Sequence, residues 1–175
     1  QPTIDLRYPI GKPAFERVLA PAQRAAFIDE IVGLPAQFEA AVAGLSETQL
    51  DTPYRPEGWT VRQLVHHVAD SHMNAYIRWK LGVTEDCPTV KPYDEAAWAR
   101  LPDSKLPIDV SLTLLRLVHE RWAVLLRDTP PEDFARKLMH PENGEITLDR
   151  MVHTYSWHGR HHTAHITGLR ERNGW

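Results

Sequence analysis

The sequence predicts an all-α protein, specifically a four-helix bundle with a long crossover between its second and third helices. Four long stretches repeat their apolar residues at steps of three and four, as amphipathic helices do. Residues of good N-cap type precede two of these stretches. The 175 residues suffice for one domain with its own core, so we expect a single domain over residues 1–175. Bundles of this kind commonly build their sites from facing helices.

The first part of the chain is expected to be an arm followed by a helix. Residues 1–20 place prolines and glycines between short apolar pieces, which predicts an irregular arm on the surface of the body. Pro21 suits the first turn of a helix that continues to Val42. Pro35 should kink this helix, or split it after Gly33–Leu34.

The second helix follows a short capped turn and a loop. Ser46 and Gln49 predict the turn, and the loop Asp51–Trp59 is rich in proline. A helix is then predicted over Thr60–Leu81, where Thr60 and Gln63 form a capping-box pattern.

The remaining elements follow from the same periodicity and turn signals. The crossover Glu85–Pro107 should carry the loops that face a substrate. From there to the C-terminus the sequence predicts a short helix at Asp94–Arg100, a long helix over Ile108–Arg127, a turn at Pro130–Phe134, a turn between short extended pieces in Lys137–Ile146, and a long helix over Leu148–Arg172.

Composition excludes several classes of protein. A formal charge of −3 and a pI near 6.4 give no electrostatic footprint for nucleic acid. The chain has no apolar run long enough for a membrane span and no secretory signal at its start. The single cysteine, Cys87, allows no internal disulfide and has no evident activating neighbour, so we do not expect it to be a nucleophile. We therefore expect a cytoplasmic protein.

The last predicted helix carries five of the ten histidines, at positions 153, 158, 161, 162 and 165. His161 and His165 are one turn apart on one face, close enough for two imidazole nitrogens to share a metal ion. His158 lies on nearly the same side. His162 falls on the apolar stripe and is expected to pack in the core. The pair at 161 and 165 is therefore the best-placed set.

A third ligand must come from elsewhere, and the second predicted helix carries His66, His67 and His72. His72 lies within the apolar stripe, whereas His67 shares a polar face with Asp70, a candidate to orient an imidazole. His119 stands alone in the third helix and is expected to pack or lie on the surface. Any single histidine on a helix is more often a packed or surface residue than a ligand, and only the paired spacing with a second cluster favours a metal site.

Several strings of the sequence closely resemble the YfiT family, whose members carry the name metal-dependent hydrolase and which belongs to the DinB-like superfamily. The resemblance extends over nearly the whole chain, from about Tyr8 to Trp175. It rests on Asp51–Arg55, Gly58–Gln63, His66–Asn74, Pro92–Glu95 and the histidine string from Trp157 to Thr167. Gly159–Arg160 departs from the more histidine-rich string of the family, at positions that are not ligands.

The resemblance implies a DinB-like antiparallel four-helix bundle. It also implies a cytoplasmic homodimer with one divalent metal ion per subunit, held by three histidines. By position these are His67, His161 and His165, and the choice of His67 over His66 rests chiefly on the resemblance. Zinc is expected first and nickel second, although three imidazoles also accept copper or iron. The glutamate of the H-E-x-x-H motif is absent, so the zinc-protease mechanism gains no support.

Three hypotheses for the function remain open. The first is a metal-dependent hydrolase whose nucleophile is a metal-bound water, with Asp70 at most orienting a ligand. The second is a transferase that adds a low-molecular-weight thiol, such as bacillithiol or mycothiol, to an electrophile. The third is a binding or stress module in which the metal only stabilises the bundle. Three neutral histidines leave zinc an open position, which suits the two enzymes equally well.

Overall fold

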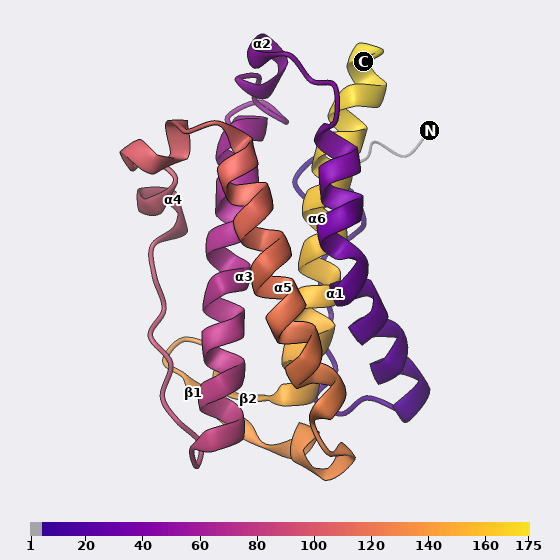
Figure 1. Cartoon of the computed structure of the whole chain (residues 1–175), viewed down its shortest axis with the longest axis vertical. Coiled ribbons are helices and arrows are strands. Elements are labelled where there is room, and N and C mark those ends of the chain that lie inside the picture. The colour runs from indigo at the N-terminus through magenta and orange to yellow at the C-terminus, as the bar shows by residue number, and fades with distance from the viewer. Residues whose placement is uncertain (1–4) are drawn as a thin grey trace.

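The computed structural model describes residues 5–175 and contains the four long helices that the sequence predicts (Figure 1). They are α1 (Pro21–Val42), α3 (Val61–Thr84), α5 (Ile108–Asp128) and α6 (Leu148–Asn173). Contacts between α1 and α6, α3 and α5, α1 and α5, and α3 and α6 close them into a ring. The predicted four-helix bundle is therefore confirmed.

The direction of each helix follows from its connections. The segment between α3 and α5 returns along the whole length of the bundle, so these two helices run parallel (Figure 1). The chain then turns back through a hairpin, and α6 runs parallel to its neighbour α1. The pairs α1–α5 and α3–α6 are antiparallel. The long crossover that the sequence predicts is thus what sets the arrangement of the bundle.

The short elements lie at the two ends of the bundle, where the capping residues place them. Ser46, Thr60 and Thr147 each accept a hydrogen bond from a backbone N–H of the first turn that follows, as N-caps do. The short elements are α2 (Glu47–Leu50), α4 (Glu95–Trp98), the 3-10 turns η1 (Pro102–Lys105) and η2 (Pro131–Ala135), and the antiparallel strands β1 (Lys137–His140) and β2 (Gly144–Thr147).

Pro35 lies inside α1 and does not split it. The expected split after Gly33–Leu34 is therefore wrong, whereas a change of direction is visible in Figure 1, where the first half of α1 leans away from the bundle. Proline has no N–H, so the carbonyl four residues earlier, that of Ile31, loses its helical partner. His119 of α5 replaces it, because its Nδ1 lies 2.7 Å from the Ile31 oxygen. Tertiary structure thus supplies the hydrogen bond that the sequence of α1 removes.

Two apolar clusters form the core, one in each half of the bundle. Trp79 and Trp122 dominate one cluster, and Phe38 and Leu64 dominate the other. Most of the buried histidines fall between the stretches of α3, α5 and α6 that feed the two clusters: His72 on α3, His119 on α5, and His161, His162 and His165 on α6. His66 and His67 lie just before Val68, the last α3 residue of one cluster. The bundle therefore has a polar layer of histidines between two apolar halves.

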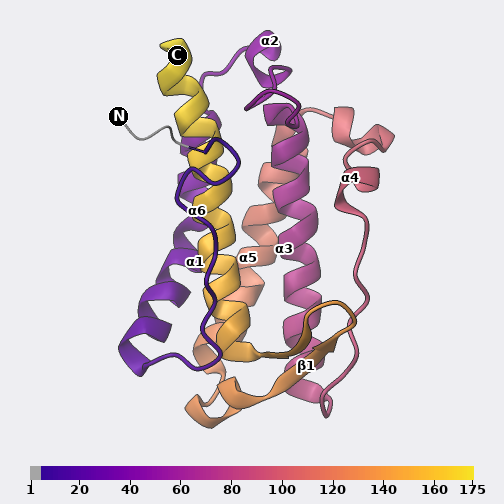
Figure 2. The ribbon, with the colours of Figure 1, turned by 180° about the vertical axis from the view of Figure 1, so that it is seen from behind.

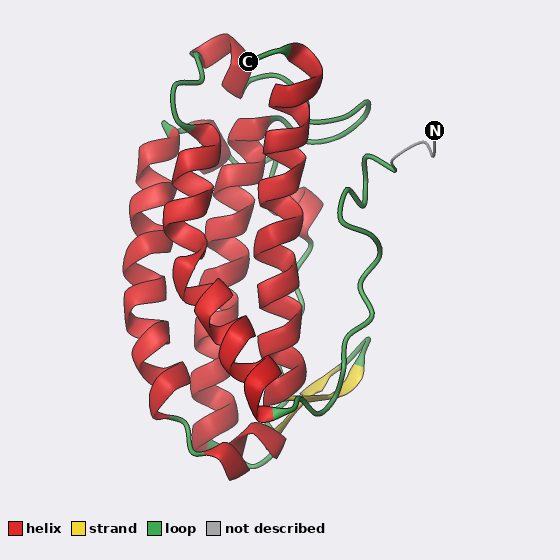
Figure 3. Cartoon of the chain, turned by 90° about the vertical axis from the view of Figure 1, so that its right-hand side faces the viewer, coloured by secondary structure: helices red, strands yellow, loops and turns green. Residues whose placement is uncertain are grey.

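The N-terminal arm is irregular over residues 5–20, as predicted; its first four residues lie outside the described part of the chain. It runs along α6 (Figure 2) and joins the bundle edge near the hairpin (Figure 3). A buried ion pair fixes its end: Asp149 is 2% exposed and binds Arg24 through both oxygens, at 2.7 and 2.9 Å. Asp149 also accepts the backbone N–H of Leu19 at 3.0 Å. The arm is thus held against the helix that carries most of the histidines.

Within residues 5–175, no helix combines the length and the apolar character that crossing a membrane requires.

Close packing of α1 against α6 depends on Gly159. A Cβ built at this position would lie 2.7 Å from both Cδ atoms of the buried Leu34. We expect Gly159→Ala to lower the free energy of unfolding by about 1–3 kcal/mol, because overpacking outweighs the gain in helix propensity. Gly168→Ala, on the same helix, is the control: its Cβ would meet only the end of the flexible Arg172 side chain. Chemical denaturation should show that the control is neutral or stabilising. Equal effects of the two substitutions would contradict this account of the interface.

Candidate metal centre

Seven histidines meet in the layer between the two apolar clusters. The spacing of the four α6 histidines along the chain explains their grouping, because residues three or four apart on a helix share a face. The rings come from three helices: His67 and His72 from α3, His119 from α5, and His158, His161, His162 and His165 from α6. Most are buried, and His158 is partly buried.

The first part of this layer is a line of hydrogen bonds that begins at the backbone of α1. A carbonyl oxygen only accepts, so His119 must donate its Nδ1–H to Ile31. In a neutral ring the other nitrogen is then an acceptor. His119 Nε2 lies 2.8 Å from His72 Nδ1, and His72 Nε2 lies 3.1 Å from His158 Nδ1. The line then leaves the core and enters the cluster on α6.

The second part of the line ends at another backbone carbonyl, in the N-terminal arm. His158 Nε2 lies 3.1 Å from His162 Nε2, and His162 Nδ1 lies 3.2 Å from His165 Nδ1. His165 Nε2 lies 3.1 Å from the carbonyl oxygen of Arg7, which again can only accept. The carbonyl at each end of the line therefore accepts one of the N–H groups that the rings supply.

Counting hydrogens shows that this line is incomplete. The five rings of His119, His72, His158, His162 and His165 make four contacts with one another and two with the terminal carbonyls, and so six in all. Each contact needs one hydrogen, and each neutral imidazole supplies one. Five neutral rings therefore leave one contact in which two nitrogen lone pairs face each other. A cation or an additional donor is needed to complete the line.

Burial makes a proton a poor choice for that cation. Desolvation lowers the pKa of His67 and of His119 to about 4, and lowers the pKa values of His72, His158 and His162 well below the ordinary value. For the last three, neighbouring histidines lower the pKa further. Among the described residues, no carboxylate forms a hydrogen bond with any of the seven rings. Neutral imidazoles with converging lone pairs are the donor set that a divalent transition metal prefers.

The ring nitrogens form two three-histidine groups close enough to hold one ion each. One group is His67, His158 and His162, and the other is His161, His162 and His165; within each, the nitrogens lie within 4.8 Å of one another. The predicted ligands are thus divided, with His67 in the first group and the other two in the second. His162, expected to pack in the core, is buried but belongs to both groups.

His161 has a feature that sets it apart from the other rings. Its Nδ1 is buried and, among the atoms of residues 5–175, finds no hydrogen-bond partner. Burial, together with the nearby His165 and His67, lowers the pKa of this imidazole to about 3. Trp157 stacks on the ring at 4.2 Å between centroids, which restricts its rotation. An unpaired buried nitrogen is costly unless a ligand completes it.

The structure separates His67 from its neighbour His66, which the sequence pattern alone could not do. His66 Nδ1 lies 2.6 Å from Ser111 Oγ, and its Nε2 lies 2.9 Å from the carbonyl of Leu106. Both nitrogens are therefore engaged in tying α3 to α5 and the crossover. His67 points to α6 instead, with its Nε2 3.4 Å from His158 Nε2 and its ring packed on Trp59. Of these two neighbours, His67 is therefore the one with a ring nitrogen available to the α6 histidines.

Asp70 lies on α3 one turn beyond His67 and was expected to orient an imidazole. No hydrogen bond of its carboxylate to a ring occurs in the described part of the chain, where its backbone oxygen binds Asn74. Burial, with a contribution from Asp103, raises the pKa of Asp70 to about 6. Its orienting role therefore stays a prediction, and the carbonyls of Ile31 and Arg7 are the groups that orient histidines here.

The N-terminal arm covers the outer side of the cluster, which sequence reasoning missed. Besides the Arg7 carbonyl on His165, the ring of Tyr8 lies 6.0 Å from that of His161, and Phe15 packs edge-on against Trp157. The arm has no periodic pattern from which such contacts could be inferred. The aromatic residues at these positions were its only signal.

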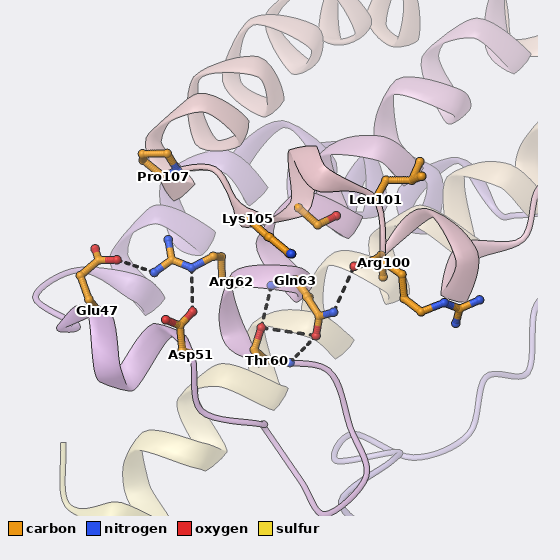
Figure 4. Close-up of a pocket in the computed structure, with 11 residues that line it drawn as sticks. Glu47, Asp51, Thr60, Arg62, Gln63, Arg100, Leu101, Lys105 and Pro107 are labelled. Atoms are coloured by element: carbon orange, nitrogen blue, oxygen red, sulfur yellow. Dashed lines mark hydrogen bonds and ion pairs between the residues drawn. The ribbon is translucent and has the colours of Figure 1, made fainter.

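A pocket of about 680 Å³ lies beside the first turn of α3, under the end of the crossover (Figure 4). Arg62 lies between Glu47 and Asp51 and forms an ion pair with each. Gln63 donates to the carbonyl of Ala99 at 3.0 Å and so ties the crossover to α3. The 11 residues drawn for this pocket include no histidine, so it is separate from the metal candidate although Gln63 is one turn from His67.

Fold and site together define a class: a four-helix bundle whose buried centre is a cluster of neutral histidines. Comparison with known proteins agrees. The family model described as the DinB superfamily matches residues 30–166. The chain therefore belongs to the DinB superfamily and, within it, to the YfiT family.

Individual relatives extend over nearly the full chain. A protein of Bacillus cereus (strain 03BB102), named "Putative metal-dependent hydrolase", is 54% identical over 171 residues, which cover 98% of this chain and 99% of the relative. A protein of Bacillus thuringiensis subsp. konkukian (strain 97-27) with the same activity name has the same identity and coverage. The solved structure of YfiT from Bacillus subtilis, described as a probable metal-dependent hydrolase with an unusual four-helix bundle topology, is 47% identical. It superimposes with a TM-score of 0.94 over 97% of this chain and 98% of that one.

The low pKa values of the buried rings predict how stability depends on pH. In the unfolded chain each histidine binds a proton below about pH 6.5, whereas in the folded protein these rings stay neutral. The unfolded state therefore binds more protons, and stability falls as pH falls, by about 1.4 kcal/mol per pH unit for each such ring. Between pH 6.5 and 5.5 each of the seven rings should cost about 1 kcal/mol, because an unfolded histidine goes from half to mostly protonated in this range, so we expect a loss of about 7 kcal/mol, measured by urea denaturation with EDTA present.

A matched pair of variants tests the origin of this pH dependence. His72→Gln removes a wholly buried ring and should reduce the slope by about one proton, whatever it does to stability at neutral pH. His153→Gln replaces a partly buried ring that faces the arm through Glu16 and should change the slope less. A flat profile in the parent would contradict this account, because it would mean that the folded cluster takes up protons over the same pH range as the unfolded chain.

Proposed function

We propose that this protein is a metal-dependent hydrolase that holds one divalent ion through His67, His161 and His165. The observation that supports it is the hydrogen count of the cluster: neutral rings, fixed by two backbone carbonyls, leave converging lone pairs without a hydrogen. A divalent ion supplies Lewis acidity there, lowering the pKa of a coordinated water to about 7 and polarising a carbonyl group. Zinc is the first candidate and nickel the second, since imidazoles accept both.

The assignment of these three ligands rests on the match of positions to the YfiT family and on features of each ring. His161 contributes the buried Nδ1, which has no hydrogen-bond partner among the described residues 5–175. His165 donates its Nε2–H to the Arg7 carbonyl, which leaves the lone pair on Nδ1, 3.2 Å from His162 Nδ1. His67 has no hydrogen-bond partner other than a cluster histidine within residues 5–175. The remaining rings, His158 and His162, link the three and would act on the water or substrate rather than on the ion.

The protein's own groups would shape the reaction by excluding water and by orienting the rings. Trp157 stacks on His161, and Tyr54 lies tilted against His165, at centroid distances of 4.2 and 4.1 Å. These contacts limit the rotation of both imidazole rings. The arm covers the same side through Tyr8 and Arg7. Ligands that are held before binding need little reorganisation, which favours both affinity and electrostatic stabilisation of a transition state.

Metal content across histidine variants tests the ligand set. Protein purified without metal-affinity resin should contain close to one divalent ion per chain by plasma mass spectrometry. His67→Ala, His161→Ala and His165→Ala should each lose it, because two imidazoles hold such an ion poorly. His153→Ala is the control, since this ring lies on the same helix but faces the arm.

Two results would contradict the ligand set as proposed. Retention of metal in His161→Ala and His165→Ala, with loss in His158→Ala and His162→Ala, would move the ion to the group around His67, His158 and His162. A parent protein free of metal after purification and after reconstitution with zinc would refute the metal-dependent function itself.

A second function, transfer of a low-molecular-weight thiol to an electrophile, is favoured by one specific observation. Among the hydrogen bonds of the described residues, none connects a carboxylate to the cluster, so a carboxylate general base for water is not in place. A water nucleophile would therefore depend on a histidine such as His158 as its base, whereas a metal ion deprotonates a bound thiol outright. Loaded protein that consumes a model electrophile only with a thiol present, and turns over no ester or amide, would establish the transferase. Metal binding without either activity would leave a metal-stabilised binding module.

We also propose that the protein is a homodimer that pairs through α5. Four large apolar side chains lie one or two turns apart along this helix and are 37–67% exposed: Val110, Leu114, Leu117 and Val124. A row of this kind on one helix face is typical of an interaction surface. Light scattering should give twice the 20.1 kDa chain mass. Leu117→Glu should give monomers, whereas Lys80→Glu on α3 should not; a monomeric parent would contradict the pairing.

A further inference from the structure

The line of histidines begins at a place where α1 lacks a hydrogen bond. In an α-helix the carbonyl of Ile31 would accept from the N–H of residue 35, but that residue is proline. The carbonyl is therefore free to accept from another helix, and His119 Nδ1 lies 2.7 Å from it. Pro35 thus leaves the Ile31 carbonyl available as an acceptor for an imidazole from α5. We call this carbonyl and His119 the anchor of the line.

This anchor determines the hydrogen position of each ring that follows. His119 must donate from Nδ1, so its Nε2 accepts from His72 Nδ1, 2.8 Å away. His72 Nε2 in turn accepts from His158 Nδ1, 3.1 Å away. His158 is then left with an unprotonated Nε2, and this atom faces His162 Nε2 at 3.1 Å and His67 Nε2 at 3.4 Å.

We propose that His72 and His119 are positioning residues, which hold His158 in its Nδ1–H tautomer so that its Nε2 lone pair faces the metal centre. There it accepts a hydrogen from a water or from an O–H, N–H or S–H group of the substrate. This role goes beyond the proposed function. Only the action of His158 on a substrate or water rests on the proposed metal centre. The tautomer itself follows from the hydrogen bonds of the chain.

The opposite end of the line does not alter this conclusion. The Arg7 carbonyl fixes His165 as an Nε2–H donor, so the missing hydrogen belongs to one of the contacts between rings. The contacts of His72 with His119 and with His158 Nδ1 lie next to Trp122 and Tyr155, at a ring that has no exposed surface and belongs to neither candidate metal group, so a metal ion would not complete them. The contacts of His162 with His158 and with His165 lie at the two candidate metal groups, where a ligand can. In both of those cases His158 keeps its hydrogen on Nδ1.

Removing the anchor should reverse the tautomer, and the reason is again the count of hydrogens. Without His119, four rings make three contacts with one another and one with Arg7, so four hydrogens satisfy every contact. All of them then point toward Arg7, and His158 donates from Nε2 to His162. We therefore expect His119→Leu to convert His158 from an acceptor to a donor at the centre.

The matched variant is His119→Gln, because an amide carries a donor and an acceptor at a separation close to that of the two ring nitrogens. Its N–H can donate to Ile31 and its oxygen can accept from His72 Nδ1–H. We expect this variant to keep His158 in the Nδ1–H tautomer. If His119 only filled space in the core, His158 would have the same tautomer in His119→Leu and in His119→Gln.

The measurement is long-range ¹H–¹⁵N NMR of the whole chain labelled at histidine, in the metal-free and zinc-loaded forms. The His158 signals are assigned by their loss in His158→Gln. Hydrogen on Nδ1 of His158 in the parent and in His119→Gln, and on Nε2 in His119→Leu, supports the proposal. Hydrogen on Nε2 in the parent, or an unchanged tautomer in His119→Leu, overturns it. The zinc content of the parent is measured separately. Failure of the proposed metal function is therefore distinguishable from failure of the proposed His158 tautomer.

Discussion

The histidine layer depends on two backbone carbonyls that can only accept hydrogen bonds. Ile31 fixes His119 at one end, and Arg7 fixes His165 at the other. Because each neutral ring passes on one donor and one acceptor, the direction set at each carbonyl is transmitted from ring to ring. The two directions meet within the cluster on α6. The geometry of the centre thus results from ordinary hydrogen-bond rules applied along a line, with its ends fixed by backbone from α1 and from the arm.

Much of the fold could be predicted, because the signals are local. The period of apolar residues located the four long helices, and Thr60 and Thr147 marked two starts to the residue, since capping depends on neighbours within one turn. The effect of Pro35 was only half predicted. The lost N–H is a local property, but its replacement by His119 comes from a helix more than eighty residues away. No reading of α1 alone could show that the helix continues.

The site was predictable to a similar extent and for the same reason. The spacing of His161 and His165 is local and marked the face of α6 correctly as a place where rings gather. The inclusion of His158 and His162 depends on how α3 and α5 approach that face, which spacing does not encode. His66 and His67 are adjacent in sequence, and only the partners Ser111 and Leu106 show that His66 is fully engaged elsewhere. The arm's carbonyl on His165 had no sequence signal, because backbone oxygens are present at every residue.

A bundle that needed only stability would have little use for this layer. A partly satisfied polar network in a core is worse than an apolar core of the same shape, and the seven rings separate two well-packed apolar clusters. The rings also have their pKa values lowered by burial, so they contribute no ion pairs in return. Their arrangement has a physical reason if a ligand completes it. A divalent ion removes the conflict between facing lone pairs, and the anchored line at the same time presents an acceptor beside the ion. The facing lone pairs that make the cluster of neutral rings unfavourable by itself are therefore the groups that a bound cation would complete.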